Sequence, residues 1–324
     1  MKKLLYLVLV PIIGLALMPP MKTEIPIYSS PLYTWLVIIF GFLGVLTLFF
    51  KINSFIKCFA ILGFINTFFS ACPFISHFAY IELILCVYLY TACVYIEDWK
   101  IVFNALWAVL IVNIILFIMQ FIHKDNILNF GLVENISSLS IGNGMQAKSL
   151  MIVLVAILMQ DKRLPDCYII RPVFYWITFF FCIYYFFAHH VLANFLYARG
   201  PVWVEGVRLG LQRPIMGWGI GEWKTLFPAM GQGDFTAEGA WYSAHNFTVQ
   251  LFFEMGLLGL VTLGLYLKSI WRKCVAKEEL FIGLLLVICT LSVHFPAFQT
   301  TSCCLVVLFF AYIERTQNDN AITA

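Results

Sequence analysis

Long apolar stretches separated by short polar connections make up most of this chain. A helix needs roughly 20 predominantly apolar residues to cross about 30 Å of hydrocarbon. We therefore predict about ten membrane-spanning helices, at residues 3–18, 31–50, 55–72, 74–96, 101–122, 140–159, 172–190, 247–267, 279–295 and 299–314. The stretch at 140–159 includes the polar run "SIGNGMQAKSL", which is compatible with a broken or re-entrant segment.

Composition places the chain among polytopic membrane proteins. Hydrophobic residues make up 62% of its 324 residues, charged residues 11%, and the mean hydropathy is +0.91. Soluble domains carry about 25% charged residues. We expect an all-α fold with a single transmembrane domain over residues 1–324. The first stretch, after Met1-Lys2-Lys3, has no small-residue cleavage site and is interpreted as a retained anchor, not a signal peptide.

The distribution of lysine and arginine predicts the orientation. Positive residues concentrate on the cytoplasmic side of membrane proteins. If both termini are cytoplasmic, 13 of the 20 cations fall on the inner side: Lys2, Lys3, Lys51, Lys57, Lys100, Lys162, Arg163, Arg171, Lys268, Arg272, Lys273, Lys277 and Arg315. Four of the seven outer cations lie in the loop at 191–247, against the usual bias. Anion binding is the simplest reason to keep them there.

The loop at 191–247 is predicted to begin with a short amphipathic helix. Gly200-Pro201 is a typical helix start, and Arg213-Pro214 a typical end. Trp203, Val207 and Leu211 recur as one apolar stripe, while Arg208 and Gln212 share another face near Glu205. Arg199 precedes the helix N-terminus, where backbone N–H groups favour an anion. "GWGIGEW" follows and is interpreted as a tight turn, and the loop beyond it is expected to be irregular.

The chain then re-enters the membrane at "AHNFTVQLFFEMG", residues 244–256. Asn246, Gln250 and Glu254 are spaced four residues apart and so share one helical face, with His245 at its outer end. Ionisable residues at membrane depth usually face the bundle interior or a wet cavity and mark functional sites. The alternative is that this face only hydrogen-bonds neighbouring helices.

Several other chemistries are not indicated by the sequence. Most of the ten cysteines lie in apolar runs, where cysteine behaves as a small hydrophobe, and the loop at 191–247 contains none. The histidines form no metal-ligand pattern, so we expect no metal and no cofactor. The net charge of +3 is small, and we expect no nucleic-acid partner.

Part of the chain resembles the O-antigen ligase and O-antigen polymerase family of bacterial membrane glycosyltransferases. The resemblance rests on Arg199 and Trp203, then Pro214, Gly217 and Gly219, then His245-Asn246, Gln250, Glu254, Gly256 and Gly259. These residues span about 70 positions, roughly a fifth of the chain. Members of the family have about a dozen spans, somewhat more than are predicted here.

The resemblance implies transfer of a glycan from a polyprenyl-diphosphate carrier to an acceptor hydroxyl, without metal, on the periplasmic side of the cytoplasmic (inner) membrane. The acceptor is another glycan or a lipid A core, and a protein acceptor is a further variant. Arg199 and His245 are then the expected catalytic residues, and Arg208 and Arg213 the expected diphosphate ligands. Trp203, Asn246, Gln250 and Glu254 are expected to line the cavity, with Glu254 as an alternative base.

A membrane transporter of an anionic solute or glycolipid is the alternative from a different class. Arg199 and His245 would then recognise the anion. Transporters often contain inverted repeats with broken helices in both halves. Only the stretch near 140–150 suggests such a break in the sequence.

Overall fold

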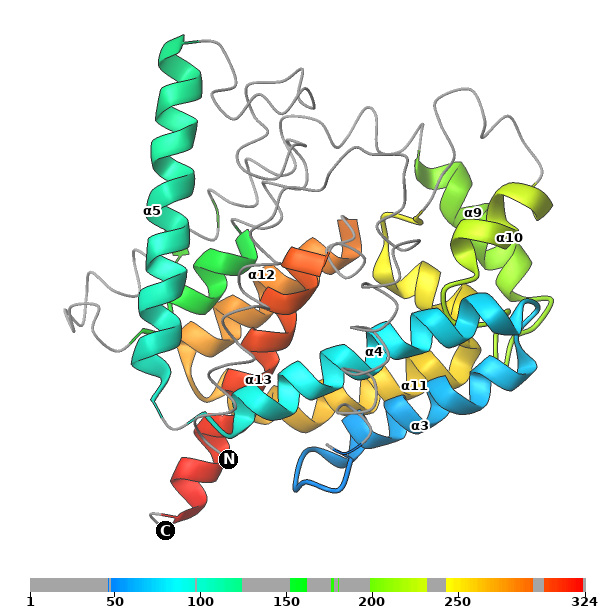
Figure 1. The fold of residues 1–324 in the computed structure, drawn as a ribbon, viewed down its shortest axis with the longest axis horizontal. Helices are drawn as coiled ribbons and strands as arrows, with labels where there is room; N and C mark the ends of the chain where they lie inside the picture. Colours follow the sequence, from blue (N-terminus) through cyan, green and yellow to red (C-terminus); the bar gives the residue numbers. More distant parts are fainter. Residues whose placement is uncertain are drawn as a thin grey trace.

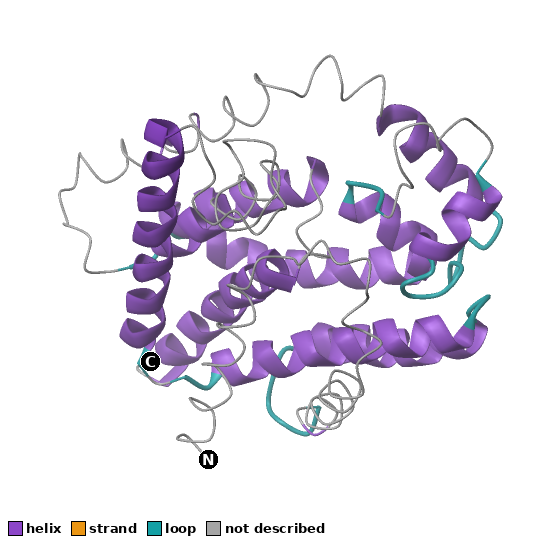
Figure 2. Cartoon of the chain, turned by 45° about the horizontal axis from the view of Figure 1, so that its top comes forward, coloured by secondary structure: helices purple, strands orange, loops and turns teal. Residues whose placement is uncertain are grey.

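The computed structural model describes residues 46, 48–96, 98–123, 152–161, 176–177, 180, 199–231, 243–293 and 300–322. The predicted span at 3–18 lies entirely outside these residues. Of the predicted spans at 31–50, 140–159 and 172–190, the larger part of each lies outside them as well. The regular structure of the described part is helical, without strands (Figure 2). Its helices are α3 (Ser54–Phe69), α4 (Pro73–Val94), α5 (Trp99–His123), α9 (Gly200–Gly210), α10 (Trp223–Met230), α11 (Phe247–Val275), α12 (Glu278–Val293) and α13 (Thr300–Ile322).

These helices confirm the positions of six predicted apolar elements to within a few residues, except that α11 and α13 run about eight residues further. Two of them, α4 and α11, are long and apolar enough to cross a membrane. The prediction that the loop beyond the "GWGIGEW" turn is irregular was wrong in part, because α10 forms there. Trp223 and Phe227 stack with ring centroids 4.2 Å apart, and both side chains are fully buried. Their burial stabilises this short helix although Pro228 lies inside it.

Helices α3, α4 and α11 lie side by side, and α12 and α13 pack against α11 and α4 respectively (Figure 1). A large apolar core fills this region, with members from α4, α5, α11, α12 and α13. Helices α9 and α10 lie at the other end of α11, around a small core of their own. That core consists of Val202, Leu209, Trp223, Phe227, Ala244 and Phe253.

Helix α11 is broken at Gly256. This residue has φ 62° and ψ −157°, a conformation that essentially only glycine adopts. The break removes the helical partners of two carbonyl groups before it and of two N–H groups after it. The carbonyls of Phe253 and Glu254 accept from Trp218 N (2.9 Å) and Gly219 N (3.0 Å) instead. Leu257 N and Leu258 N donate to the carbonyls of Pro214 (2.8 Å) and Ile215 (3.2 Å).

The segment at 214–222, which we call the inserted turn, therefore replaces the hydrogen bonds that α11 loses. The two backbones approach too closely for side chains at the contact. A Cβ on Gly217 would lie 2.5 Å from the carbonyl carbon of Glu254, and one on Gly256 would overlap the carbonyl of Ile215. The interpretation of "GWGIGEW" as a tight turn is confirmed, since Gly217, Gly219 and Gly221 all have positive φ.

Replacing Gly256 with alanine is expected to destabilise the protein strongly. The backbone conformation alone costs about 1–3 kcal/mol for a non-glycine residue, and the overlap with Ile215 adds to it. Gly264 on the same helix has open space around it, so Gly264→Ala is the matched control and should stabilise by up to about 1 kcal/mol. Thermal unfolding of the purified protein measures both. Equal melting temperatures for the two variants would contradict the described break.

Candidate active site

Arg199 and helix α9 form one side of the candidate site. The helix starts directly after Arg199, with Pro201 in its first turn. Val202, Gly206 and Leu209 face the small aromatic core. The Trp203 indole N–H donates to the carbonyl of Ala244, 2.6 Å away, and so ties α9 to the residue before His245.

The exposed apolar residues of α9 and its C-cap are Val204, Val207 and Leu211. Trp203 is the half-buried member of the predicted stripe, because its indole binds the carbonyl of Ala244. The helix itself has the predicted start, and its helical turns end at Gly210, three residues before Arg213.

His245 lies opposite, in a fixed turn at the start of α11. Its φ of 50° is positive, which is uncommon for a residue other than glycine. The neighbouring backbone holds this conformation on both sides. Ala244 donates its N–H to Gln250 Oε1 (3.1 Å), and Asn246 caps α11 by accepting from Val249 N (3.1 Å).

Gln250 and Glu254 continue this network into the protein. Gln250 Nε2 donates to Glu254 Oε1 (2.8 Å), so the predicted shared helical face is confirmed. Glu254 also accepts from Gly221 N (2.9 Å) and Trp223 N (3.4 Å). Both side chains are buried, at 1% and 3% exposure. They connect the turn at His245 to the inserted turn.

Charge and burial together set the protonation of His245. Burial, and to a smaller extent the positive charge of Arg199, together lower its pKa to about 4. Burial also lowers the pKa of Arg199, which nevertheless stays charged because arginine titrates far above neutral pH. The site at pH 7 therefore pairs a neutral imidazole with a nearby guanidinium.

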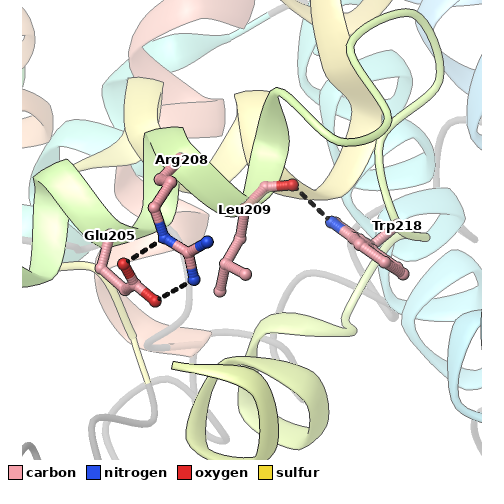
Figure 3. A network of polar contacts seen from close by, with 4 residues as sticks. All are labelled: Glu205, Arg208, Leu209 and Trp218. Carbon is pink, nitrogen blue, oxygen red and sulfur yellow. Dashed lines mark hydrogen bonds and ion pairs between the residues drawn. The ribbon is translucent and has the colours of Figure 1, made fainter. Parts of the chain in front are cut away.

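The other two loop arginines have contacts of their own. Arg208 forms a bidentate ion pair with Glu205, with both N···O distances 2.7 Å (Figure 3). Figure 3 also shows Trp218, whose indole N–H donates to the carbonyl of Leu209 (2.9 Å). Arg213 lies 4.5 Å from the centroid of the Trp218 ring and donates to the carbonyl of Phe69 (3.1 Å).

The structure thus brings most of the predicted site residues together. Arg199 and His245 are close enough to interact electrostatically, and Trp203, Asn246, Gln250 and Glu254 fix the backbone around His245. Sequence reasoning missed Asn66 of α3, which is 1% exposed. Its side chain donates to the carbonyls of Met216 and Glu254 and accepts from Ile220 N. An amide within the apolar run "ILGFINTFF" was the available signal.

No family model matches the chain, and neither a curated protein nor a solved structure matches it.

Replacing Arg199 with glutamine is expected to raise the pKa of His245 only part of the way from about 4 towards 6.5. Burial is the larger cause of the depression and remains in the variant, while the charge is removed. NMR titration of the His245 ring measures this. A pKa that returns fully to 6.5, or does not move, would contradict the described environment.

Replacing Gln250 with leucine is expected to destabilise the protein by about 1–3 kcal/mol for each polar group that loses its partner. Ala244 N loses its partner, and Glu254 Oε1 keeps only the weaker bond from Trp223 N at 3.4 Å. Thr248 is an exposed polar residue one half-turn away, and Thr248→Val should change stability by less than about 0.5 kcal/mol. Chemical denaturation in detergent compares the two. Similar small changes in both would argue against the network.

Proposed function

We propose that this protein is a membrane glycosyltransferase that moves a glycan from a polyprenyl-diphosphate carrier to an acceptor hydroxyl. The observation that carries the proposal is the pairing of Arg199 with a neutral, half-buried His245 at the start of an apolar helix long enough to cross a membrane. A charged head group and a hydrocarbon tail on one donor molecule require such a combination. The resemblance in the sequence motifs points to the same chemistry.

The proposal includes the membrane arrangement expected from the sequence. About ten spans, with both termini in the cytoplasm, put the loop at 191–247 on the periplasmic side of the cytoplasmic membrane. The cation distribution and the apolar helices α4 and α11 support this topology. A lipid-borne donor and a glycan or lipid A-core acceptor can meet at that boundary.

Arg199 is proposed to bind the diphosphate. In the reaction, the acceptor oxygen forms a bond to the anomeric carbon, and the bond from that carbon to the diphosphate oxygen breaks. Negative charge grows on the leaving polyprenyl diphosphate. A guanidinium binds phosphate oxygens bidentately, and a fixed positive group aimed at developing charge lowers the barrier.

Arg208 and Arg213 are proposed as further diphosphate ligands. Glu205 uses two of the five N–H donors of Arg208, whose side chain is 43% exposed. Arg213 is exposed as well and donates one N–H to Phe69. Both therefore retain surface through which an anion can approach. Their contacts with Glu205 and Trp218 hold the guanidinium groups in place.

His245 is proposed to handle the proton. As a neutral ring at pH 7 it can accept the proton of the acceptor hydroxyl. A bound diphosphate is negatively charged and raises the pKa of a nearby imidazole, so the same ring can pass a proton to the leaving oxygen. Glu254 is assigned a different role. Its carboxylate already accepts from Gln250, from Gly221 N of the inserted turn and from Trp223 N at the start of α10. Glu254 therefore holds the site together.

The proposal predicts that Arg199→Ala and His245→Ala each lower kcat by about 100-fold or more, because each removes a group acting on the transition state. The assay supplies a polyprenyl-diphosphate-linked oligosaccharide with glycan or lipid A-core acceptors and measures released polyprenyl diphosphate. Chelation with EDTA should leave the rate unchanged. Lys224→Ala removes an exposed cation from the same loop and serves as the matched control.

Turnover of Arg199→Ala and His245→Ala at the wild-type rate would refute the catalytic assignment. Movement of intact donor across a vesicle membrane, with no release of polyprenyl diphosphate, would identify a transporter instead.

A further inference from the structure

The corner between α3 and α4, residues 69–73, is docked onto the inserted turn. Ala71 donates its N–H to the carbonyl of Trp218 (2.9 Å). Asn66 binds the turn at Met216 and Ile220. These contacts join parts of the chain about 150 residues apart, and at their centre lies an acidic residue that the proposed reaction does not use.

That residue is Glu222, the last of the inserted turn, with 0% exposure. Its Oε1 accepts from Cys72 N at 2.8 Å and lies 2.7 Å from Ser70 Oγ. Ser70 Oγ lies 2.7 Å from Ser76 Oγ, which lies 2.8 Å from the carbonyl oxygen of Ile220. Among the described residues, no donor reaches the second carboxyl oxygen, Oε2.

The protons in this chain of oxygens can be counted. Three short O···O contacts link Glu222 to Ser70, Ser70 to Ser76, and Ser76 to Ile220. Each contact of 2.7–2.8 Å requires one proton between its two oxygens. The serine hydroxyls supply two, and the Ile220 carbonyl supplies none. The third proton must come from the carboxyl group of Glu222.

The charged surroundings agree with this count. Arg213 and Lys224 are the nearest cations along the chain. The α3–α4 corner contributes the titratable Cys72, α4 contributes His77 and α11 contributes Glu254. In the described part of the chain none of them forms an ion pair with Glu222. An ionised carboxylate buried without a cation, and with one oxygen lacking a donor, is costly. A neutral carboxylic acid avoids most of that cost.

We propose that Glu222 is a neutral carboxylic acid in the folded protein and donates its proton to Ser70, which donates to Ser76, which donates to the Ile220 carbonyl. Burial raises the pKa of Glu222, in the same direction. The bound proton links the α3–α4 corner to the inserted turn. Glu254 of α11 binds the same turn at Gly221 N. If the proposed function is right, Glu222 is thereby a positioning residue for the inserted turn, which Glu254 and Gln250 connect to the turn at His245.

Infrared spectroscopy of the full chain in nanodiscs at pH 7 tests the protonation directly. The difference spectrum of wild type minus Glu222→Gln should contain the C=O stretch of one protonated carboxylic acid, shifting in D2O. Glu205→Gln is the matched control, because Glu205 is ion-paired with Arg208 and should lose only carboxylate bands. Loss of carboxylate bands in Glu222→Gln would overturn the proposal.

Ser76→Ala gives a second test that leaves the carboxyl group in place. Removing the hydroxyl changes the hydrogen bond that Ser70 makes, so the carboxylic-acid band should shift in frequency without disappearing. A shift confined to carboxylate bands would overturn the assignment. Neither measurement depends on glycosyl transfer, so both decide the protonation of Glu222 even if the proposed function fails.

The pH dependence of stability provides a check on the same proton. The unfolded chain releases it near pH 4.3, whereas the folded protein retains it to higher pH. The melting temperature of the wild type relative to Glu222→Gln should therefore fall as pH rises above about 4.3. A relative melting temperature that stays constant or rises with pH would contradict the proposal.

In the transfer assay, Glu222→Gln should retain more activity than Glu222→Ala. Glutamine keeps a donor to Ser70, whereas alanine removes the side-chain partner that Glu222 provides to Ser70 and to Cys72 N. If both variants lose the same amount of transfer activity while the infrared result is as expected, Glu222 is protonated but the proton has no role in positioning the site.

Discussion

The exchange of backbone hydrogen bonds between broken helix α11 and the inserted turn is the constraint on which the rest of the structure depends. A backbone N–H or C=O group buried without a partner is costly, so a buried helix can be interrupted only where other parts of the protein supply the missing partners. Pro214, Ile215, Trp218 and Gly219 supply all four at Gly256. The glycines at 217 and 256 permit the close approach. The conformation of each segment is therefore determined by the other.

This exchange also fixes the chemistry at the end of α11. Glu254 stands two residues before the break, and its carboxylate accepts from Gly221 N and Trp223 N while Gln250 connects it to Ala244. Trp203 of α9 binds the other side of Ala244. The turn at His245 is thus placed by a continuous set of hydrogen bonds that reaches α3 at Asn66. In the proposed reaction, a site preorganised in this way would keep its charged groups in position without reorganisation.

The sequence predicted the parts of this arrangement that depend on local periodicity. Apolar stretches predicted the helices, Gly200-Pro201 the start of α9, and four-residue spacing the shared face of Gln250 and Glu254. It did not predict the break at Gly256, because hydropathy carries no information about φ and ψ. Nor did it predict the roles of Asn66, Glu222 or the Trp203 indole. Their partners are distant in the sequence, so no local pattern contains the contact.

The central claim is that Arg199 and His245 form one site that receives a diphosphate. The most direct test is the pKa of His245 measured by NMR with and without polyprenyl diphosphate. The claim predicts that the pKa rises from about 4 when the diphosphate binds, because negative charge beside the ring favours its protonated form. It also predicts that Arg199→Gln weakens binding. A diphosphate that binds without changing the pKa of His245 would place the anion elsewhere and contradict the proposed site.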